Sequence, residues 1–139
     1  MLDKNAAGIE VNAIVTPQIP KSAVVQCTAA NTSLDAPTNI VQLLQAGPRG
    51  GRLTKLKATP AVNVTATQLQ LFREPAGGDV CFTHSELMGA HNISATTKTP
   101  STDFGYSNDS PLQLGPNEIL HVGIGVAGKV NFEAEWCDY

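Results

Sequence analysis

Charge and aromatic rings are scarce in this sequence. Asp, Glu, Lys and Arg make up only 15% of its 139 residues, and Phe, Trp and Tyr only 5%. Disordered acidic chains are rich in charge and poor in apolar residues, whereas 42% of this chain is hydrophobic, so that class is excluded. A formal net charge of −3 provides no general field that attracts nucleic acid, and we expect no nucleic-acid partner.

Long apolar segments are also missing. Because no run of about 18 apolar residues is present, we expect no membrane span and no membrane partner. The first residues, MLDKNAAGIEVNAIV, lack a continuous apolar segment behind a basic one, and we expect no secretory signal. These absences predict a protein that folds in a cytoplasm.

The cysteines are few, odd in number and far apart: Cys27, Cys81 and Cys137. An odd count excludes a complete disulfide framework, and no CxxC pair is available for zinc. We expect three free thiols, at least two of them buried as small hydrophobic side chains. A catalytic cysteine paired with a distant histidine is the less favoured alternative.

Thr, Asn, Gly, Pro and Ser take the place of charge, and this composition is typical of strands and turns. No segment of ten or more residues keeps a 3.6-residue apolar period, and short runs bounded by Gly, Pro and Asn recur instead. Proline cannot donate to a central ladder, so the position of all nine prolines between these runs supports the division. The predicted strands are Gly8–Val15, Ala23–Thr28, Ile40–Gln45, Arg52–Thr59, Gln68–Arg73, Val80–Glu86, Asn92–Thr97, Ile119–Val126 and Val130–Cys137.

Short strands at this spacing are typical of a sandwich or a barrel. We predict an all-β chain, a jelly-roll or Greek-key β-sandwich of about eight antiparallel strands. The length favours one domain over residues 1–139. Residues 1 to about 8 would form a short N-terminal arm that is available to a partner.

The last two predicted strands show the clearest alternation. Apolar residues occupy the even positions of both Leu120–Val126 and Val130–Cys137. If these strands form a hairpin with a three-residue turn, His121 pairs with Glu133, and a shift of that turn pairs it with Glu135. We expect His121 on an outer face beside a carboxylate, as an exposed pair. The alternative is a pH-responsive contact at a subunit interface.

Side chains that could carry catalysis or hold a metal are scattered. The segment CFTHSEL places His84 and Glu86 on one strand face, but a metal site needs three or four converging ligands. No GxSxG elbow is present, and GIGVAG lies between two strands rather than between a strand and a helix. Its glycines instead indicate a close approach of another segment to bare backbone. We expect no catalytic residue, no cofactor and no metal.

Basic residues cluster within residues 49–57, although the net charge of the chain is negative. The four basic residues of this stretch are Arg49, Arg52, Lys55 and Lys57. Nucleic-acid grooves combine such charge with aromatic rings, which this stretch lacks, and its RGG occurs only once. Leu56 and Ala58 share a face while Leu53 falls on the other, which predicts a bulge before Leu56 and an outward direction for Lys55 and Lys57. Outward lysines protect a sheet edge or contact an acidic partner protein.

The segment Thr99–Pro111, TPSTDFGYSNDSP, is the longest loop that we expect. It carries Phe104 and Tyr106, two of the few aromatic residues of the chain. We expect this loop to pack partly on the body of the protein or on a neighbour. A long connection of this kind also fits a Greek-key or jelly-roll topology.

One part of the chain resembles a known group of proteins. Asn31–Phe72 contains NTSLDAPTNIVQLLQAGPRGGRLTKLKATP followed by LQLF. Small structural proteins of tailed bacteriophages carry a similar pattern, N.s.d.p.n.vtl..aG..G.ri..i...at, which leads into an a.rLF strand. The pattern covers about a third of the chain and consists of turn and strand residues. Within this group the chain most resembles the capsid cement, or decoration, proteins.

This resemblance implies a jelly-roll fold without catalytic residues and a place on the outside of an icosahedral phage head. The partner would be the major capsid protein, and the chain would form a homo-oligomer, a dimer or a trimer, on the capsid surface. It would be made in the host bacterial cytoplasm and reside on the capsid exterior of the virion. Candidate capsid contacts are Arg49, Arg52, Lys55, Lys57, Phe104 and Tyr106.

Two other functions stay open. A carbohydrate-binding, lectin-like sandwich would need exposed aromatic rings beside polar groups, and the parity of Trp136 places that residue in the core. A tail-associated module shares most features of a head protein, so the sequence does not distinguish a tail protein from a head protein.

Overall fold

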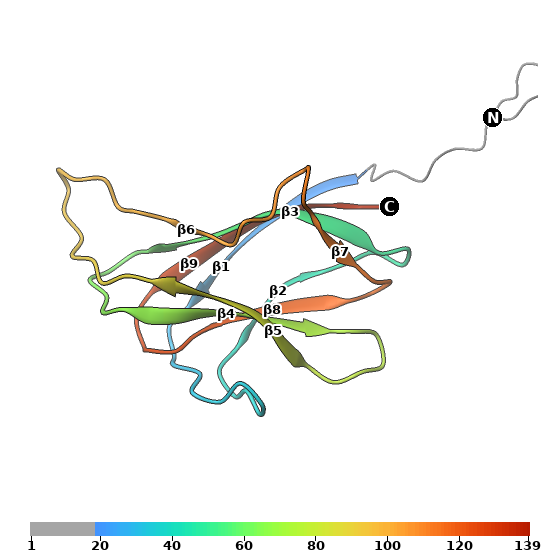
Figure 1. Cartoon of the computed structure of the whole chain (residues 1–139), viewed down its shortest axis with the longest axis horizontal. Coiled ribbons are helices and arrows are strands. Elements are labelled where there is room, and N and C mark those ends of the chain that lie inside the picture. Colours follow the sequence, from blue (N-terminus) through green and yellow to red (C-terminus); the bar gives the residue numbers. More distant parts are fainter. Residues whose placement is uncertain (1–18) are drawn as a thin grey trace, which may run out of the picture.

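The computed structural model describes residues 19–139, and these form two antiparallel β-sheets packed face to face (Figure 1). The predicted all-β sandwich is therefore confirmed. The first sheet has the order β1-β9-β3-β6, with β7 also paired to β3, and its strands are β1 (Ile19–Cys27), β9 (Val130–Asp138), β3 (Gly51–Pro60), β6 (Thr102–Asp103) and β7 (Leu112–Leu114). The second sheet has the order β2-β8-β4-β5, and its strands are β2 (Val41–Gln45), β8 (Ile119–Ile124), β4 (Thr67–Glu74) and β5 (Cys81–Met88).

The chain passes between the sheets repeatedly. Along the described residues, only β4 to β5 and β6 to β7 connect strands of the same sheet, and every other connection crosses to the opposite sheet. The two sheets also meet at two edges, where β1 lies beside β2 and β5 lies beside β6 (Figure 1). This order is compatible with the two Greek keys of a jelly roll.

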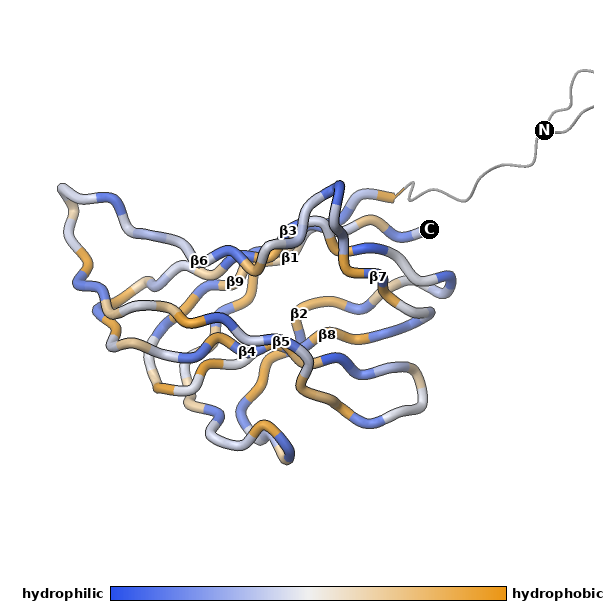
Figure 2. The backbone as a smooth tube through the Cα atoms, viewed as in Figure 1, coloured by the Kyte–Doolittle hydropathy of each residue, from blue (hydrophilic) through white to orange (hydrophobic). Residues whose placement is uncertain are grey.

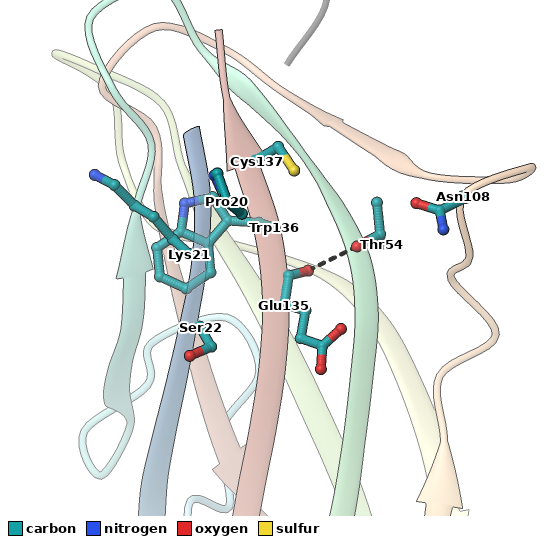
Figure 3. A pocket seen from close by; sticks show the side chains of 8 residues that line it. All are labelled: Pro20, Lys21, Ser22, Thr54, Asn108, Glu135, Trp136 and Cys137. Atoms are coloured by element: carbon teal, nitrogen blue, oxygen red, sulfur yellow. Dashed lines mark hydrogen bonds between the residues drawn. The ribbon is translucent and has the colours of Figure 1, made fainter. Parts of the chain in front are cut away.

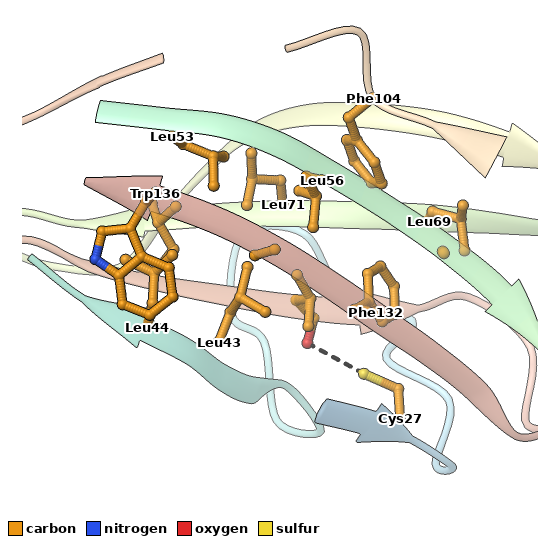
Figure 4. Packing of buried hydrophobic residues seen from close by; sticks show 14 of the residues in the cluster. Cys27, Leu43, Leu44, Leu53, Leu56, Leu69, Leu71, Phe104, Phe132 and Trp136 are labelled. Carbon is orange, nitrogen blue, oxygen red and sulfur yellow. Dashed lines mark hydrogen bonds between the residues drawn. The ribbon is translucent and has the colours of Figure 1, made fainter. Parts of the chain in front are cut away.

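Hydrophobic and hydrophilic residues alternate along the strands (Figure 2). The apolar side chains fill the space between the sheets (Figure 4). In β3 the predicted inward residues Leu56 and Ala58 are fully buried. Leu53 is buried as well, because the pairing of β3 with β9 shifts register between Leu53 and Lys55, at the predicted bulge. Trp136 is 7% exposed, which confirms its predicted place in the core. Since both sheets contribute buried side chains, neither inner face is left to water.

The predicted hairpin of the last two strands is wrong. Strand β8 pairs with β2 and β4, whereas β9 pairs with β1 and β3 in the other sheet. His121 therefore does not pair with Glu133 or Glu135, and its Nε2 lies 2.8 Å from Oε1 of Glu74 on β4. The alternation of the two strands is explained by inner faces that oppose each other across the core, rather than by one shared face.

Some other strand predictions are wrong, and one falls outside the described residues. Asn92–Thr97 is not a strand, and only the preceding residue, His91, forms an isolated bridge with Val64. The prolines do not all fall between strands, because Pro20 lies in the edge strand β1 and Pro60 ends β3. The predicted strand Gly8–Val15 and the proposed N-terminal arm lie outside the described residues.

The loop between β1 and β2 folds over the outer side of the second sheet (Figure 1). Asn31 is fully buried, and its Nδ2 donates to Oε1 of Gln70 at 3.0 Å while Nε2 of Gln70 donates to the Asn31 carbonyl at 3.1 Å. The Asn31 Oδ1 also accepts the backbone N–H of Thr38. A Cβ on Gly123 would lie 2.8 Å from the Gln70 Oε1, so a residue without a side chain is needed there. This agrees with the prediction that another segment closely approaches the glycines of GIGVAG.

The three cysteines are free, as predicted, but only one is fully buried. Cys27 lies in the core, where its Sγ donates to the carbonyl of Val122 at 3.6 Å (Figure 4). Burial raises the pKa of the Cys27 thiol to about 12, so it stays protonated and unreactive. Cys137 is half-buried and Cys81 is exposed, and the expectation of at least two buried thiols is therefore wrong.

Candidate functional site

Charged side chains form a ladder on the outer face of the first sheet. Glu133 and Glu135 of β9 stand opposite Lys57 and Lys55 of β3. The Lys55 Nζ lies 3.5 Å from Glu135 and 3.8 Å from Glu133, and the Lys57 Nζ lies 3.5 Å from Glu133. We call these four residues the charge ladder. Their side chains keep at least a third of their area exposed, so each pair stabilises the fold by about 1 kcal/mol or less.

The ladder changes the interpretation of the basic stretch. Strand β3 lies between β9 and the short strands β6 and β7. Lys57 pairs with Asp103 of β6 and so is not on a sheet edge, whereas Lys55 falls between the segments that pair with β6 and β7. Their charges are compensated by neighbouring glutamates. The outer face therefore presents alternating charge to solvent, rather than a basic patch.

The two predicted arginine contacts lie apart from the ladder. Arg49 is exposed in the turn that precedes β3, where the N–H of Gly50 donates to the Gly47 carbonyl at 2.9 Å. Arg52 is half-buried opposite Cys137 on β9 and Gln113 on β7. Its buried Nε has no hydrogen-bond partner among the described residues. Only Arg49 is therefore freely presented to a partner.

A shallow depression of about 470 Å³ lies at the end of the same outer face (Figure 3). Its lining residues come from β1, β3, β9 and one loop, and they are Pro20, Lys21, Ser22, Thr54, Asn108, Glu135, Trp136 and Cys137. The Thr54 hydroxyl donates to the Glu135 carbonyl at 3.2 Å (Figure 3). Four of these eight residues carry a hydroxyl, amide or carboxylate group, so the depression offers polar contacts near the ladder.

The two aromatic residues of the Thr99–Pro111 segment have structural positions. Phe104 is 3% exposed and packs between the sheets against Phe132, with ring centroids 6.4 Å apart (Figure 4). Phe104 is therefore unavailable as a capsid contact, and that prediction is corrected. The prediction that the loop packs on the body of the protein is confirmed.

Tyr106 is half-buried and joins this loop to β5. Its hydroxyl lies 2.8 Å from Nδ1 of His84, whose Nε2 lies 2.7 Å from Oε2 of Glu86. The shared face predicted for His84 and Glu86 is thus confirmed. Burial raises the pKa of Tyr106, so the phenol stays protonated and can donate to the histidine. This chain of contacts holds the loop in place, and it leaves Tyr106 only partly available to a partner.

Arg73 and Glu118 form an ion pair that the sequence did not indicate. The Arg73 guanidinium donates to both oxygens of Glu118, with Nη2 2.9 Å from Oε1, and the Gly115 N–H donates to the same Oε1 at 2.8 Å. Burial raises the pKa of Glu118. The hydrogen bonds from Arg73 and Gly115, together with the Arg73 charge, lower it by more than burial raises it, so the pKa is below the ordinary value. The bonds to Glu118 in turn raise the pKa of Arg73. This pair joins β4 to the turn before β8.

Converging ligands are missing from the part of the chain that the structure describes. Within residues 19–139, no three His, Cys, Asp or Glu side chains lie close enough together to hold a metal ion. The same residues include no helix with the length and apolar character to cross a membrane. The described residues form a sandwich whose first sheet carries the charge ladder on its outer face.

Comparison of this chain with protein-family models, with curated proteins and with solved structures finds no match.

Proposed function

We propose that this chain is a non-enzymatic virion structural protein that binds the outside of an icosahedral phage head and bridges neighbouring major capsid proteins. The observation that carries the proposal is the resemblance over Asn31–Phe72. Its motif positions coincide with three features of the sandwich. These are the loop between β1 and β2, which Asn31 binds to Gln70, the turn from Gly47 to Gly51, and the strands β3 and β4. The strand order supports a jelly-roll assignment.

The mechanism of this proposal is stabilisation by mass action. A protein that binds only the assembled shell raises the apparent stability of that shell, and the gain grows logarithmically once its free concentration exceeds its dissociation constant. A head offers many identical sites, so modest contact area at each copy is sufficient when one copy touches two capsid proteins. A sandwich whose strands are already paired suits this role, because few backbone groups have to be ordered on binding.

The outer face with the charge ladder is our candidate contact surface. Positive and negative side chains alternate over a short distance on this face. It would therefore recognise a capsid surface by the arrangement of its charges more than by their net value. The polar depression beside Glu135 extends the same surface. The described aromatic side chains are all buried or half-buried, and so they form no exposed platform for sugar binding.

Electron cryo-microscopy of virions tests the proposal directly. We expect density for this sandwich on the exterior of the head, between neighbouring capsid proteins. Density at the tail would favour the tail-associated alternative, and absence from the particle would refute a structural role. Binding of the purified chain on a glycan array would support the carbohydrate-binding alternative instead.

Charge reversal tests the contact surface. Lys55→Glu and Lys57→Glu together would place four carboxylates on the ladder, and we expect head occupancy to fall by about tenfold or more. Lys129→Glu is the matched control, because Lys129 is exposed on the turn between β8 and β9 and lies outside the ladder. Co-sedimentation with heads measures occupancy, and equal occupancy for all variants would remove the ladder from the contact.

A further inference from the structure

An aromatic pair lies on the outer face of the second sheet, away from the core between the sheets. Leu71 of β4 belongs to that core, so the next residue, Phe72, points to the opposite face of the sheet. Phe72 is nevertheless fully buried. Phe82 of β5 stands opposite Phe72 and packs against it edge to face, with ring centroids 5.6 Å apart. Because Phe82 is only half-buried, part of this apolar pair is open to solvent.

A depression of about 340 Å³ opens beside this pair. It is lined by Leu34 and Asp35 of the loop between β1 and β2, and by Val80, Cys81 and Phe82 where β5 begins. Leu34, Val80 and Phe82 are half-buried, and Asp35 is the one charged residue of the lining. Ligand pockets range from about 300 to 1,000 Å³, so this volume suits a protruding side chain rather than a cofactor.

The loop side of the depression is held in place by its own hydrogen bonds. The Ala36 N–H donates to the Ser33 Oγ at 3.0 Å and closes the turn that carries Leu34 and Asp35. The Asn31 Nδ2 donates to the Ser33 carbonyl at 3.0 Å and also binds the second sheet through Gln70. Few groups on this side therefore have to be ordered when a ligand enters.

The carboxylates at this depression are not compensated by the protein itself. Asp35 and Asp79, at the end of the turn between β4 and β5, are exposed and form no ion pair with any residue in the range 19–139. Arg73 stands opposite Cys81 on β4, but Glu118 already pairs with its guanidinium. The apolar opening is therefore flanked by free negative charge.

We propose that this depression binds a segment of a partner protein in which an apolar side chain is followed by a lysine or arginine. The apolar side chain enters the depression and covers Leu34 and Phe82, which supplies affinity. The basic side chain lies over Asp35 and Asp79, which selects the sign of the partner charge. A segment with an acidic residue in the same place meets like charge and is rejected.

The position of the depression fits a bridging role. The charge ladder lies on the outer face of the first sheet, and Phe72 and Phe82 lie on the outer face of the second sheet. One copy can therefore contact two neighbouring proteins through opposite faces of the sandwich. The inference rests on the proposed function in one respect: the basic segment would belong to the second of the two capsid proteins that the chain bridges.

Titration of the isotopically labelled full chain with short peptides tests the site by nuclear magnetic resonance. The probe is acetyl-Gly-Leu-Lys-Gly-amide, and its matched controls carry glutamate in place of lysine, or glycine in place of leucine. We expect the probe to shift the amide signals of Leu34, Val80 and Phe82 and to leave those of Glu133 and Glu135 unchanged. Each control peptide should bind about tenfold more weakly or less.

Charge reversal on the protein provides the matching test. In the variant Asp35→Lys, Asp79→Lys, we expect the preference to reverse, so that the glutamate peptide binds more tightly than the lysine peptide. Asp109→Lys is the control, because Asp109 is exposed on the segment between β6 and β7 and should keep the original preference. Signals that shift only away from the depression, or a preference that survives the double reversal, would overturn the proposal.

Co-sedimentation with phage heads separates this inference from the proposed function. We expect the Asp35→Lys, Asp79→Lys variant to lower head occupancy by about tenfold. If the unmodified chain does not bind heads, the proposed function fails, and the peptide titration alone decides whether the depression is a binding site. If heads bind the unmodified chain and the double variant equally, the proposed function stands and the depression is overturned as a capsid contact.

Discussion

Buried polar side chains hold the loops of this protein to its sheets. Asn31, Gln70, Glu118 and Asp138 are all less than 5% exposed, and each has a hydrogen-bond or ion-pair partner. Such pairs make a net contribution of about 1 kcal/mol per hydrogen bond, but losing one partner leaves the other buried and unsatisfied. Single substitutions at these residues therefore have larger effects than substitutions in the charge ladder.

Asn31→Ala should lower the free energy of unfolding by about 3 kcal/mol. The substitution removes the Nδ2 donor to the Gln70 Oε1 and the acceptor of the Thr38 N–H, and it leaves the Gln70 Oε1 buried without that donor. Denaturant unfolding measures the loss. Asn39→Ala is the control, because Asn39 is exposed and its side chain donates only to the Ala30 carbonyl. Equal losses for both variants would contradict the clamping role of Asn31.

Glu118 should make the stability of the protein depend on acid pH. Its pKa in the folded state lies below the ordinary value of 4.5, because its bonds to Arg73 and Gly115 and the Arg73 charge outweigh the effect of burial. The stabilisation is therefore complete above the unfolded pKa and is lost as the pH falls through the lower folded pKa.

Glu118→Gln tests this dependence. We expect lower stability than the unmodified protein at neutral pH, because Arg73 loses its charged partner, and a smaller further loss below about pH 4.5. Thermal melts at several pH values measure both effects. The exposed Glu135→Gln is the control and should change neutral stability by about 1 kcal/mol or less. A Glu118→Gln variant with the acid sensitivity of the unmodified protein would disprove the assignment.

At the scale of the element, apolar alternation predicted the longer strands well. The predicted range 52–59 corresponds to β3, with its inward Leu56 and its bulge in the expected place. Two elements escaped prediction, because β6 and β7 have 2 and 3 residues and are too short to display a period of two. They form where the segment between β5 and β8 pairs with the edge of β3 that does not face β9.

The turn that leads into β3 depends on Gly50. Its φ is +80°, and a Cβ there would lie 2.3 Å from the Leu114 carbonyl oxygen, so Gly50→Ala combines backbone strain with a clash. We expect a loss of about 3 kcal/mol or more in denaturant unfolding. Gly77→Ala is the matched control: φ is +74° but no atom lies within 4 Å, and strain alone should cost about 1 kcal/mol. Similar losses would show that the clash is relieved by a shift of β7.

At the scale of the whole molecule, the two sheets should unfold together. The single tryptophan, Trp136, lies between the sheets near Leu44 (Figure 4), so its fluorescence reports their separation. We expect fluorescence and far-UV circular dichroism to give coincident denaturation midpoints. Refolding should be slow for the size, on the order of milliseconds to seconds, because nearly every strand pairs with a partner distant in sequence. A fluorescence change that precedes the loss of strand signal would show that one sheet unfolds first.

The sequence by itself determined that the described chain forms strands, where most of them lie, and which side chains point inward. Those properties follow from local composition and from a period of two, which each strand carries within itself. Only the tertiary structure decided which strands are neighbours. Strands β8 and β9 are adjacent in sequence, and their alternation is equally compatible with one hairpin or with two opposed sheets, because both arrangements bury the same residues. Closure of the core selected the second arrangement, and with it Glu74 as the partner of His121 and Glu133 and Glu135 as the partners of the lysines on β3.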